Sequence, residues 1–199
     1  MSRKQTTENN EYYHVFNRGA DKRNIFKDEI DYNRFLESLK YFNTKRPIFS
    51  IYTTKIRENF SAKTVPEALI SARGTTFSDA CLVDIIDFNL LPNHFHLILK
   101  QKIKTGIPLF MQKLGAGYTR YFNERYGKTG HLFQGPYRIK HLNYTEYYTW
   151  CRLYVRYNHL IHGMNSTDNL YSSLSDSSRI STGEDLLIDK SELETLIKE

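Results

Sequence analysis

Apolar residues recur along the first half of the chain at two different spacings. Residues 11–17, EYYHVFN, are largely aromatic or β-branched and end at Arg18–Gly19, which is typical of a strand followed by a turn. Between residues 28 and 43 the apolar positions recur at helical spacing. The pattern therefore predicts a strand and then an amphipathic helix.

The second half continues with the same two patterns. Residues 81–91 and 94–100 are apolar runs separated by two turn residues, which predicts a β-hairpin. We expect a helix at 107–126, a short strand at 138–142, and a third helix that begins with Thr145 as its N-cap and reaches about residue 160.

Strand, helix, hairpin, helix, strand and helix form an α+β pattern, which predicts an antiparallel sheet with helices packed on one face. The other face would then be open to a ligand. We expect one main domain over residues 1–164, in which 44–80 is an insertion-like excursion with a strand near 48–53. Residues 165–199 are interpreted as an acidic, Ser-rich tail with a short helix.

Positive charge is concentrated in the middle of the chain. Of 28 Lys and Arg, nine lie between Lys100 and Lys140 beside one acidic residue, whereas eight of the 22 Asp and Glu lie beyond residue 164. Solvated helix faces would explain an isolated run of charge. Aromatic residues alternate with these cations, however, as in proteins that hold single-stranded nucleic acid. The expected DNA surface comprises Lys113, Arg120, Arg125, Lys128, His131, Arg138 and Lys140, with a turn-capping role as the alternative for His131.

The spacing of the cysteines and the lengths of the apolar runs narrow the class of protein further. Cys81 and Cys151 have no paired spacing, which argues against a disulfide framework or a zinc knuckle. No segment has the apolar run of a signal peptide or the length of a membrane span. We therefore expect no membrane association, and a cytoplasmic protein that joins the nucleoid when bound to DNA.

Two histidines lie one residue apart in LLPNHFHLILK, residues 90–100. Side chains alternate along a strand, so His94 and His96 should share one face while Phe95 and Leu97 point to the other. Imidazoles also fill sheet faces by bonding to carbonyls, so a metal role needs a third ligand.

The last predicted helix offers candidates for that ligand and for a nucleophile. Tyr154 and Asn158 are four residues apart and share a helix face. Among the other tyrosines expected to be helical, none is followed four residues later by a ligand for a hard cation, and Tyr147 is followed by Cys151, a soft ligand. On pattern alone, the amphipathic helix favours Tyr154 as a core aromatic residue over Tyr154 as a nucleophile.

Several separated motifs resemble the single-tyrosine HUH transposases, and most closely their REP-associated branch. They are YHVFNRG with IFKDEIDYNRFLESL, LLPNHFHLIL, YTRYFNERYGKTGHLFQGPYR, and YVRYNHLIHG. The resemblance implies an RRM-like or ferredoxin-like sheet and a catalytic domain over residues 1–164. It also implies a divalent metal, Mg²⁺ or Mn²⁺, and a 5′-phosphotyrosine intermediate on single-stranded hairpin DNA.

Matched to the family motifs, His94 and His96 are the metal pair, Tyr154 is the nucleophile and Asn158 is the third ligand. The chain departs from the family in its long 44–80 segment and in having His159 directly after Asn158, which makes His159 a competing ligand. We therefore expect a metal-dependent transposase that cleaves and rejoins hairpin DNA, as a monomer or a homodimer. The alternatives are a hairpin DNA- or RNA-binding module without catalysis, and a nickase of the rolling-circle type.

Overall fold

Four antiparallel strands and three long helices make up the part of the chain that the structure, a computed structural model, describes. This part covers residues 6–48, 50–52, 81–161 and 171–172, without the side chains of residues 159–161. In chain order the elements are β1 (Tyr12–Arg18), the 3₁₀ turn η1 (Ala20–Lys22), α1 (Glu29–Tyr41), β2 (Val83–Leu91), β3 (His94–Gln101), α4 (Gly106–Tyr126), β4 (Arg138–His141) and α5 (Thr145–Ile161).

The sheet has the strand order β2-β3-β1-β4, with every pair antiparallel. β3 is therefore a central strand that pairs with β1 on one side and β2 on the other. A bulge between Ile85 and Asp87 shifts the register of β2. Because facing residues of paired strands point to the same side, His96 shares its row with Asn89 on β2 and Phe16 on β1.

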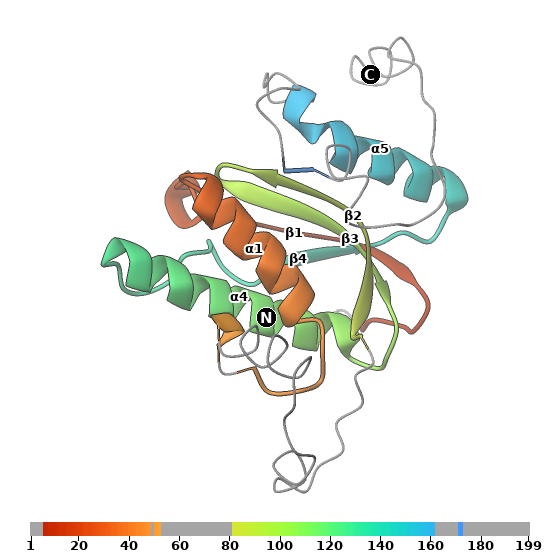
Figure 1. Cartoon of the computed structure of the whole chain (residues 1–199). Helices are drawn as coiled ribbons and strands as arrows, with labels where there is room; N and C mark the ends of the chain where they lie inside the picture. Colours follow the sequence, from red (N-terminus) through yellow and green to blue (C-terminus); the bar gives the residue numbers. More distant parts are fainter. Residues whose placement is uncertain (1–5, 49, 53–80, 162–170, 173–199) are drawn as a thin grey trace, which may run out of the picture.

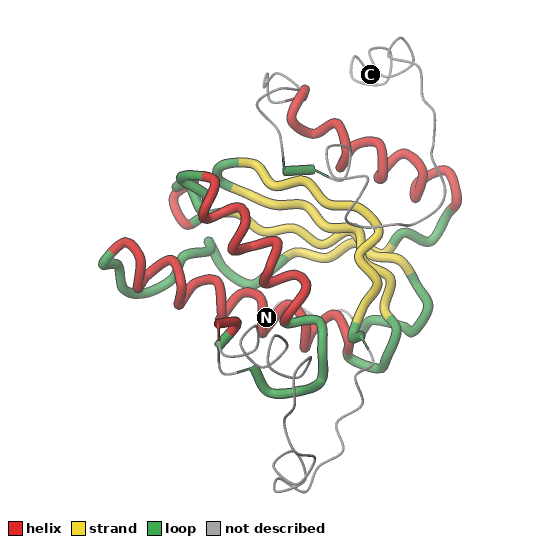
Figure 2. The backbone as a smooth tube through the Cα atoms, in the orientation of Figure 1, coloured by secondary structure: helices red, strands yellow, loops and turns green. Residues whose placement is uncertain are grey.

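Helices cover both faces of the sheet (Figures 1 and 2). α1 and α4 lie against the face formed by residues such as Val15, Phe95 and Leu97, which belong to the main apolar core. α5 lies over the opposite face, where Ile98, Cys151 and Val155 belong to a second, smaller cluster. The predicted α+β class with an antiparallel sheet is confirmed. The expectation that helices cover one face only was wrong, because α5 buries Cys151 and Val155 against the face that carries the His pair.

A capping residue fixes the start of α1, and a glycine on α4 lets the two helices pack closely. Asp28 is the N-cap of α1, and its carboxylate accepts a hydrogen bond from the backbone of Asp31. A Cβ added to Gly117 on α4 would lie 2.4 Å from the Phe42 ring at the end of α1. The second glycine of the pair, Gly115, has open space where its Cβ would be. Only Gly117 is thus required for packing against another part of the protein.

The predicted and observed elements differ in a few places. Thr145 is the first residue of α5 rather than its N-cap. The predicted strand at 48–53 is wrong where it is described, because Ile51 and Tyr52 are helical and the Ile51 side chain is buried. Most of the excursion at 44–80 and of the tail at 165–199 lies outside the described residues, as does the expected short helix at the end of the chain.

None of the helices in the described part of the chain is long and apolar enough to cross a lipid bilayer. The longest of them, α4, is amphipathic and buries residues such as Phe110, Leu114 and Phe122 against the sheet and α1. Its apolar residues are therefore accounted for by the core.

Candidate active site

The hairpin that carries the His pair has a turn fixed by the segment between β1 and α1. The carbonyl oxygen of Pro92 accepts hydrogen bonds from the backbone of Ile25 and Phe26, and that of Asn93 accepts one from Gly19. β3 starts directly after this turn, at His94. The start of β3 is therefore held by backbone contacts and not only by strand pairing.

His94 and His96 point to the same face, as predicted, and Phe95 and Leu97 are buried in the core on the other side. The two imidazole rings lie edge to face with centroids 5.2 Å apart. Nδ1 of His94 lies 2.5 Å from the side-chain oxygen of Asn93, and Nδ1 of His96 lies 2.8 Å from Nε2 of His14. In both rings Nδ1 is engaged by the protein, which makes Nε2 the atom suited to ligate a metal.

His14 is a third histidine in this site, contributed by β1. It is buried, and its ring stacks on that of His96 with centroids 5.1 Å apart. Burial lowers the pKa of His14 to about 4, with the positive charge of Lys140 as a second cause. Near neutral pH its ring is therefore uncharged and can act as donor or acceptor toward His96.

Tyr154 on α5 lies directly over this cluster. Its ring is edge-on to His96 at 5.6 Å and to His14 at 6.2 Å, measured between centroids. The side chain is half-buried. The structure thus brings the predicted nucleophile and the predicted metal pair into one site, although they are far apart in sequence.

A buried ion cluster fixes α5 over the sheet. The carboxylate of Asp87 on β2 is fully buried and accepts hydrogen bonds from Nε of Arg152 at 2.5 Å and Nε of Arg156 at 2.7 Å. The amide of Asn89 donates to the carbonyl oxygens of Val155 and Arg156. These contacts hold the helical turn that contains Tyr154 in a defined position.

Asn158 lies one helical turn beyond Tyr154 and is fully buried. Neither the nitrogen nor the oxygen of its amide has a hydrogen-bond partner in the described part of the chain. An unpaired buried amide costs about 1–3 kcal/mol, so a ligand for its oxygen would relieve a real cost. The side chain of His159, the competing third ligand, lies outside the described residues.

The predicted metal ligands combine two nitrogen donors with one oxygen donor. Among the described residues, no three His, Cys, Asp or Glu side chains are grouped so that they could hold a metal ion. Two imidazoles and the amide oxygen of Asn158 would give a divalent ion three protein donors and leave coordination positions for substrate. The expectation of Mn²⁺ or Mg²⁺ stays a prediction. Cys151 is buried, which raises its pKa to about 12, so a thiolate beside Tyr147 is disfavoured.

An open groove of about 2290 Å³ begins at His94 and runs along β4 to α4. Four of the predicted DNA-binding residues line it: Arg120, His131, Arg138 and Lys140. Arg18 at the end of β1 also lines the groove and was not predicted. The open space at Gly115 belongs to the same groove, so this glycine leaves room for a ligand and Gly117 does not.

The other three predicted DNA-binding residues lie elsewhere. Arg125 joins α4 to α1 through ion pairs with Asp28 and Asp31 at 2.7 and 2.6 Å. The ammonium of Lys113 donates to the backbone carbonyls of Thr44 and Arg46. Lys128 follows the end of α4 and does not line the groove. Their predicted contacts with DNA stay predictions, but the charge of Arg125 is already compensated within the fold.

Three residues of the site were missed from the sequence, namely His14, Asp87 and Asn89. The sequence carried a signal for two of them. Asp87 and Asn89 lie two residues apart in a largely apolar strand, which predicts a polar patch on one face of the sheet. His14 had no such signal, since its role depends on the pairing of β1 with β3.

Comparisons with known proteins address the fold and the family. Curated protein sequences gave no match. A solved structure of a REP-associated tyrosine transposase bound to a REP hairpin is similar in fold, with a TM-score of 0.51 over 96% of this chain and 94% of that one, at 13% sequence identity. A likeness at that identity supports the fold.

The sequence itself is assigned by a family model. Residues 48–158 match the model described as "Transposase IS200 like". The match includes His94 and His96 on β3, all of α4 and β4, and α5 as far as Asn158. Since it covers more than half of the 199 residues, the chain belongs to the IS200-like transposase family.

Proposed function

We propose that this transposase cleaves and rejoins single-stranded hairpin DNA through a covalent bond between Tyr154 and a 5′-phosphate. The observation that carries the proposal is the position of the Tyr154 ring, edge-on to His96 of the His pair. The structural relative that was solved with a REP hairpin supports hairpin DNA as the substrate class.

Each site residue has a distinct role in this proposal. The Tyr154 oxygen attacks the phosphorus, the bond from phosphorus to the 3′ oxygen breaks, and the departing 3′ oxygen takes a proton. The phenol proton passes to solvent as the new ester forms. In the reverse step a 3′ hydroxyl attacks the phosphotyrosine and releases Tyr154, so cleavage and joining use one site.

His94, His96 and Asn158 would hold the divalent metal, which when bound supplies positive charge against the phosphate oxygens. The chain's own contribution is to orient these ligands. His14 faces Nδ1 of His96, and Asn93 faces Nδ1 of His94. Ligating histidines commonly donate their second N–H in this way, which fixes the ring orientation.

Two other functions use parts of the same structure. A hairpin-binding module would need the groove but not the cluster of His14, His96 and Tyr154. A rolling-circle nickase would share the whole site and differ in substrate, so the covalent chemistry does not separate it from a transposase. Rejoining of a cleaved strand to a second strand separates the two enzymes, because a transposase is expected to form that product.

The test is adduct formation by Tyr154→Phe. Wild-type protein, incubated with Mn²⁺ and a pool of hairpin oligonucleotides with randomised single-stranded tails, should give a protein–DNA species on a denaturing gel. Tyr154→Phe removes one oxygen and keeps the ring, so the adduct should disappear while hairpin binding persists. Tyr157→Phe is the matched control on the same helix and should retain the adduct.

Specific outcomes would contradict the proposal. An adduct in Tyr154→Phe would assign the attack to another tyrosine, with Tyr157 and Tyr147 as the next candidates. Tight binding of the hairpin pool without an adduct at any metal concentration would favour the binding module. Sequencing the covalently captured strands would identify the recognised hairpin.

A further inference from the structure

Trp150 is an exposed aromatic residue in the middle of α5. Its side chain is 45% exposed, although its ring is among the largest apolar groups in the protein. Neighbouring residues on the helix, such as Cys151 and Val155, are buried against the sheet. The exposed surface of Trp150 is therefore not explained by packing of α5, and large exposed aromatic surfaces commonly mark a binding site.

The Trp150 ring lies parallel to the ring of Tyr154. The two centroids are 5.5 Å apart and the planes differ by 11°. The centroid of the Tyr147 ring lies 6.5 Å from that of Trp150, again with an angle of 11° between the planes. The spacing of three and four residues puts all three side chains on one helix face. They form an aromatic surface that ends at Tyr154.

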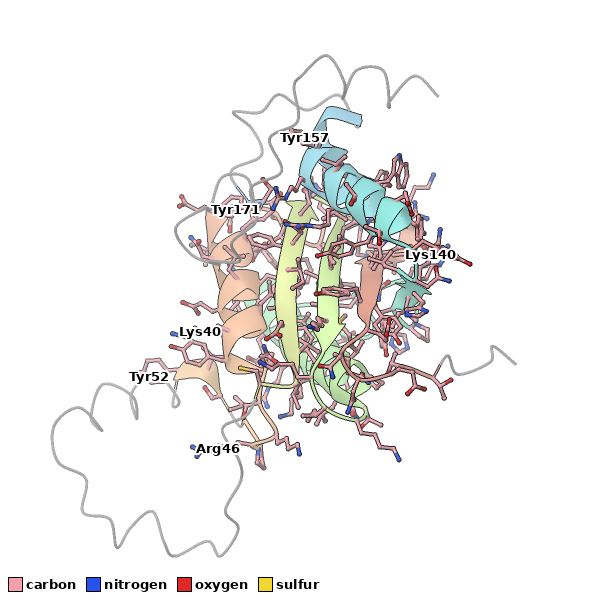
Figure 3. All side chains as sticks on the ribbon, turned by 90° about the vertical axis from the view of Figure 1, so that its right-hand side faces the viewer. Lys40, Arg46, Tyr52, Lys140, Tyr157 and Tyr171 are labelled. Atoms are coloured by element: carbon pink, nitrogen blue, oxygen red, sulfur yellow. The ribbon has the colours of Figure 1, made fainter. Side chains whose placement is uncertain are left out.

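Positive charge lies next to this surface. Lys140 on β4 is exposed, and its charge acts on both His14 in the site and Cys151 on α5. Figure 3 shows Lys140 at the edge of the sheet beside the first turns of α5. Arg138 lies on the same strand and side as Lys140 and lines the groove. Aromatic side chains beside a cationic track are the arrangement that binds single-stranded nucleic acid.

We propose that Trp150 stacks on a nucleobase of single-stranded DNA adjacent to the phosphate that Tyr154 attacks. The proposal rests on the proposed function, because it takes Tyr154 as the attacking residue. A base held against Trp150 fixes the sugar and phosphate next to it, one helical turn from the Tyr154 oxygen. Trp150 is then a positioning residue for the scissile phosphate, and stacking makes it tolerant of base identity.

Because the chain contains one tryptophan, fluorescence excited at wavelengths that tyrosine does not absorb reports on Trp150 alone. The experiment uses the Tyr154→Phe variant, which excludes covalent chemistry, and a hairpin oligonucleotide with single-stranded tails. Binding should quench the tryptophan emission, and the same hairpin without tails should not. A series of abasic sites along the tails should abolish quenching at one position next to the cleaved bond.

Trp150→Ala should lower affinity for the tailed hairpin roughly 5- to 150-fold, the range expected when one stacked base is released. In this variant the critical abasic site should cause no further decrease. Trp150→Phe should recover part of the affinity, since a smaller ring still stacks. Tyr144→Ala is the matched control, because Tyr144 is 67% exposed just before α5 and is not part of the parallel stack.

The outcomes separate this inference from the proposed function. Quenching by tailed hairpins without any adduct in the wild-type protein would support the stacking and sink the strand transfer. An adduct accompanied by unchanged fluorescence, with full affinity in Trp150→Ala, would overturn the stacking and leave the strand transfer intact. Emission that changes with protein concentration and ignores DNA would assign Trp150 to contact with a second copy of the chain, and would also overturn the proposal.

Discussion

His14 contacts His96 and is not one of the proposed metal ligands, so it would support the proposed site by orienting His96. We predict that His14→Phe, which keeps a buried ring but removes Nε2, lowers affinity for Mn²⁺ about 10- to 100-fold, because His96 loses the partner that orients it. Mn²⁺ binding to the DNA-free protein, followed by electron paramagnetic resonance, measures this directly.

The control for this substitution is another histidine that also has a side-chain partner. His141 on β4 pairs with Glu11 at 2.9 Å and lies outside the site, so His141→Phe should leave Mn²⁺ affinity unchanged. Equal affinities in all three proteins would show that His14 has no role in metal binding. A decrease in both variants would point to a general effect of altering the β1–β4 pair.

At the scale of elements, Gly115 and Gly117 in the interior of α4 have opposite expected effects. We predict that Gly115→Ala stabilises the protein by about 0.5–1 kcal/mol, because alanine favours the helix and its methyl group meets open space. Gly117→Ala should instead destabilise it by about 1–3 kcal/mol, the usual cost of overpacking, because the methyl group would collide with Phe42.

Urea unfolding of the two variants side by side gives both free energies of unfolding, and each variant is the control for the other. If Gly117→Ala were as stable as Gly115→Ala, the Phe42 ring would have to give way, and the close packing of α1 on α4 would not depend on this glycine. The sign of the difference between the two free energies of unfolding is therefore the informative quantity.

The elements themselves were largely predictable, because apolar periodicity reports directly on which residues of a segment are buried. That is why β1, α1, the hairpin, α4, β4 and α5 were all predicted within a few residues of their observed bounds. The periodicity of α5 could not say which sheet face it covers, since an apolar stripe fits either. The strand predicted near Ile51 failed because a short apolar run has no distinct period.

Within the site, too, relations that are local in sequence were predictable and long-range ones were not. His94 and His96 were predictable as a pair because their relation is local to one strand, and Tyr154 and Asn158 because theirs is local to one helix turn. His14 and Asp87 depend on strand register and on helix placement, which are long-range properties of the fold. The roles of metal ligand and nucleophile came from family resemblance rather than from spacing.

At the scale of the whole molecule, the groove connects the site to a basic surface. We predict that Arg138→Glu weakens binding of hairpin DNA and lowers the slope of log affinity against log salt by about 0.7–0.9 for each DNA phosphate that the protein no longer neutralises. Titrations of the Tyr154→Phe variant at several salt concentrations, with and without Arg138→Glu, provide the slopes.

Lys102→Glu is the matched control for this charge reversal. Lys102 is exposed and pairs with Asp84 at 3.0 Å, and it does not line the groove. Its reversal changes the net charge by the same amount and should alter the salt slope little. Equal salt slopes in the two variants would mean that DNA affinity depends on the overall charge of the protein and not on the residues that line the groove.

Because β4 lies at the edge of the sheet, its basic residues also help to prevent aggregation. An edge strand exposes backbone groups that can pair with a strand of another molecule, and shortness and charge oppose such pairing. β2, at the other edge, has a backbone hydrogen bond from Leu90 to Tyr171. β4 is four residues long and carries Arg138 and Lys140 at exposed positions. Apolar residues at these two positions would turn a basic edge into a template for intermolecular β-sheet.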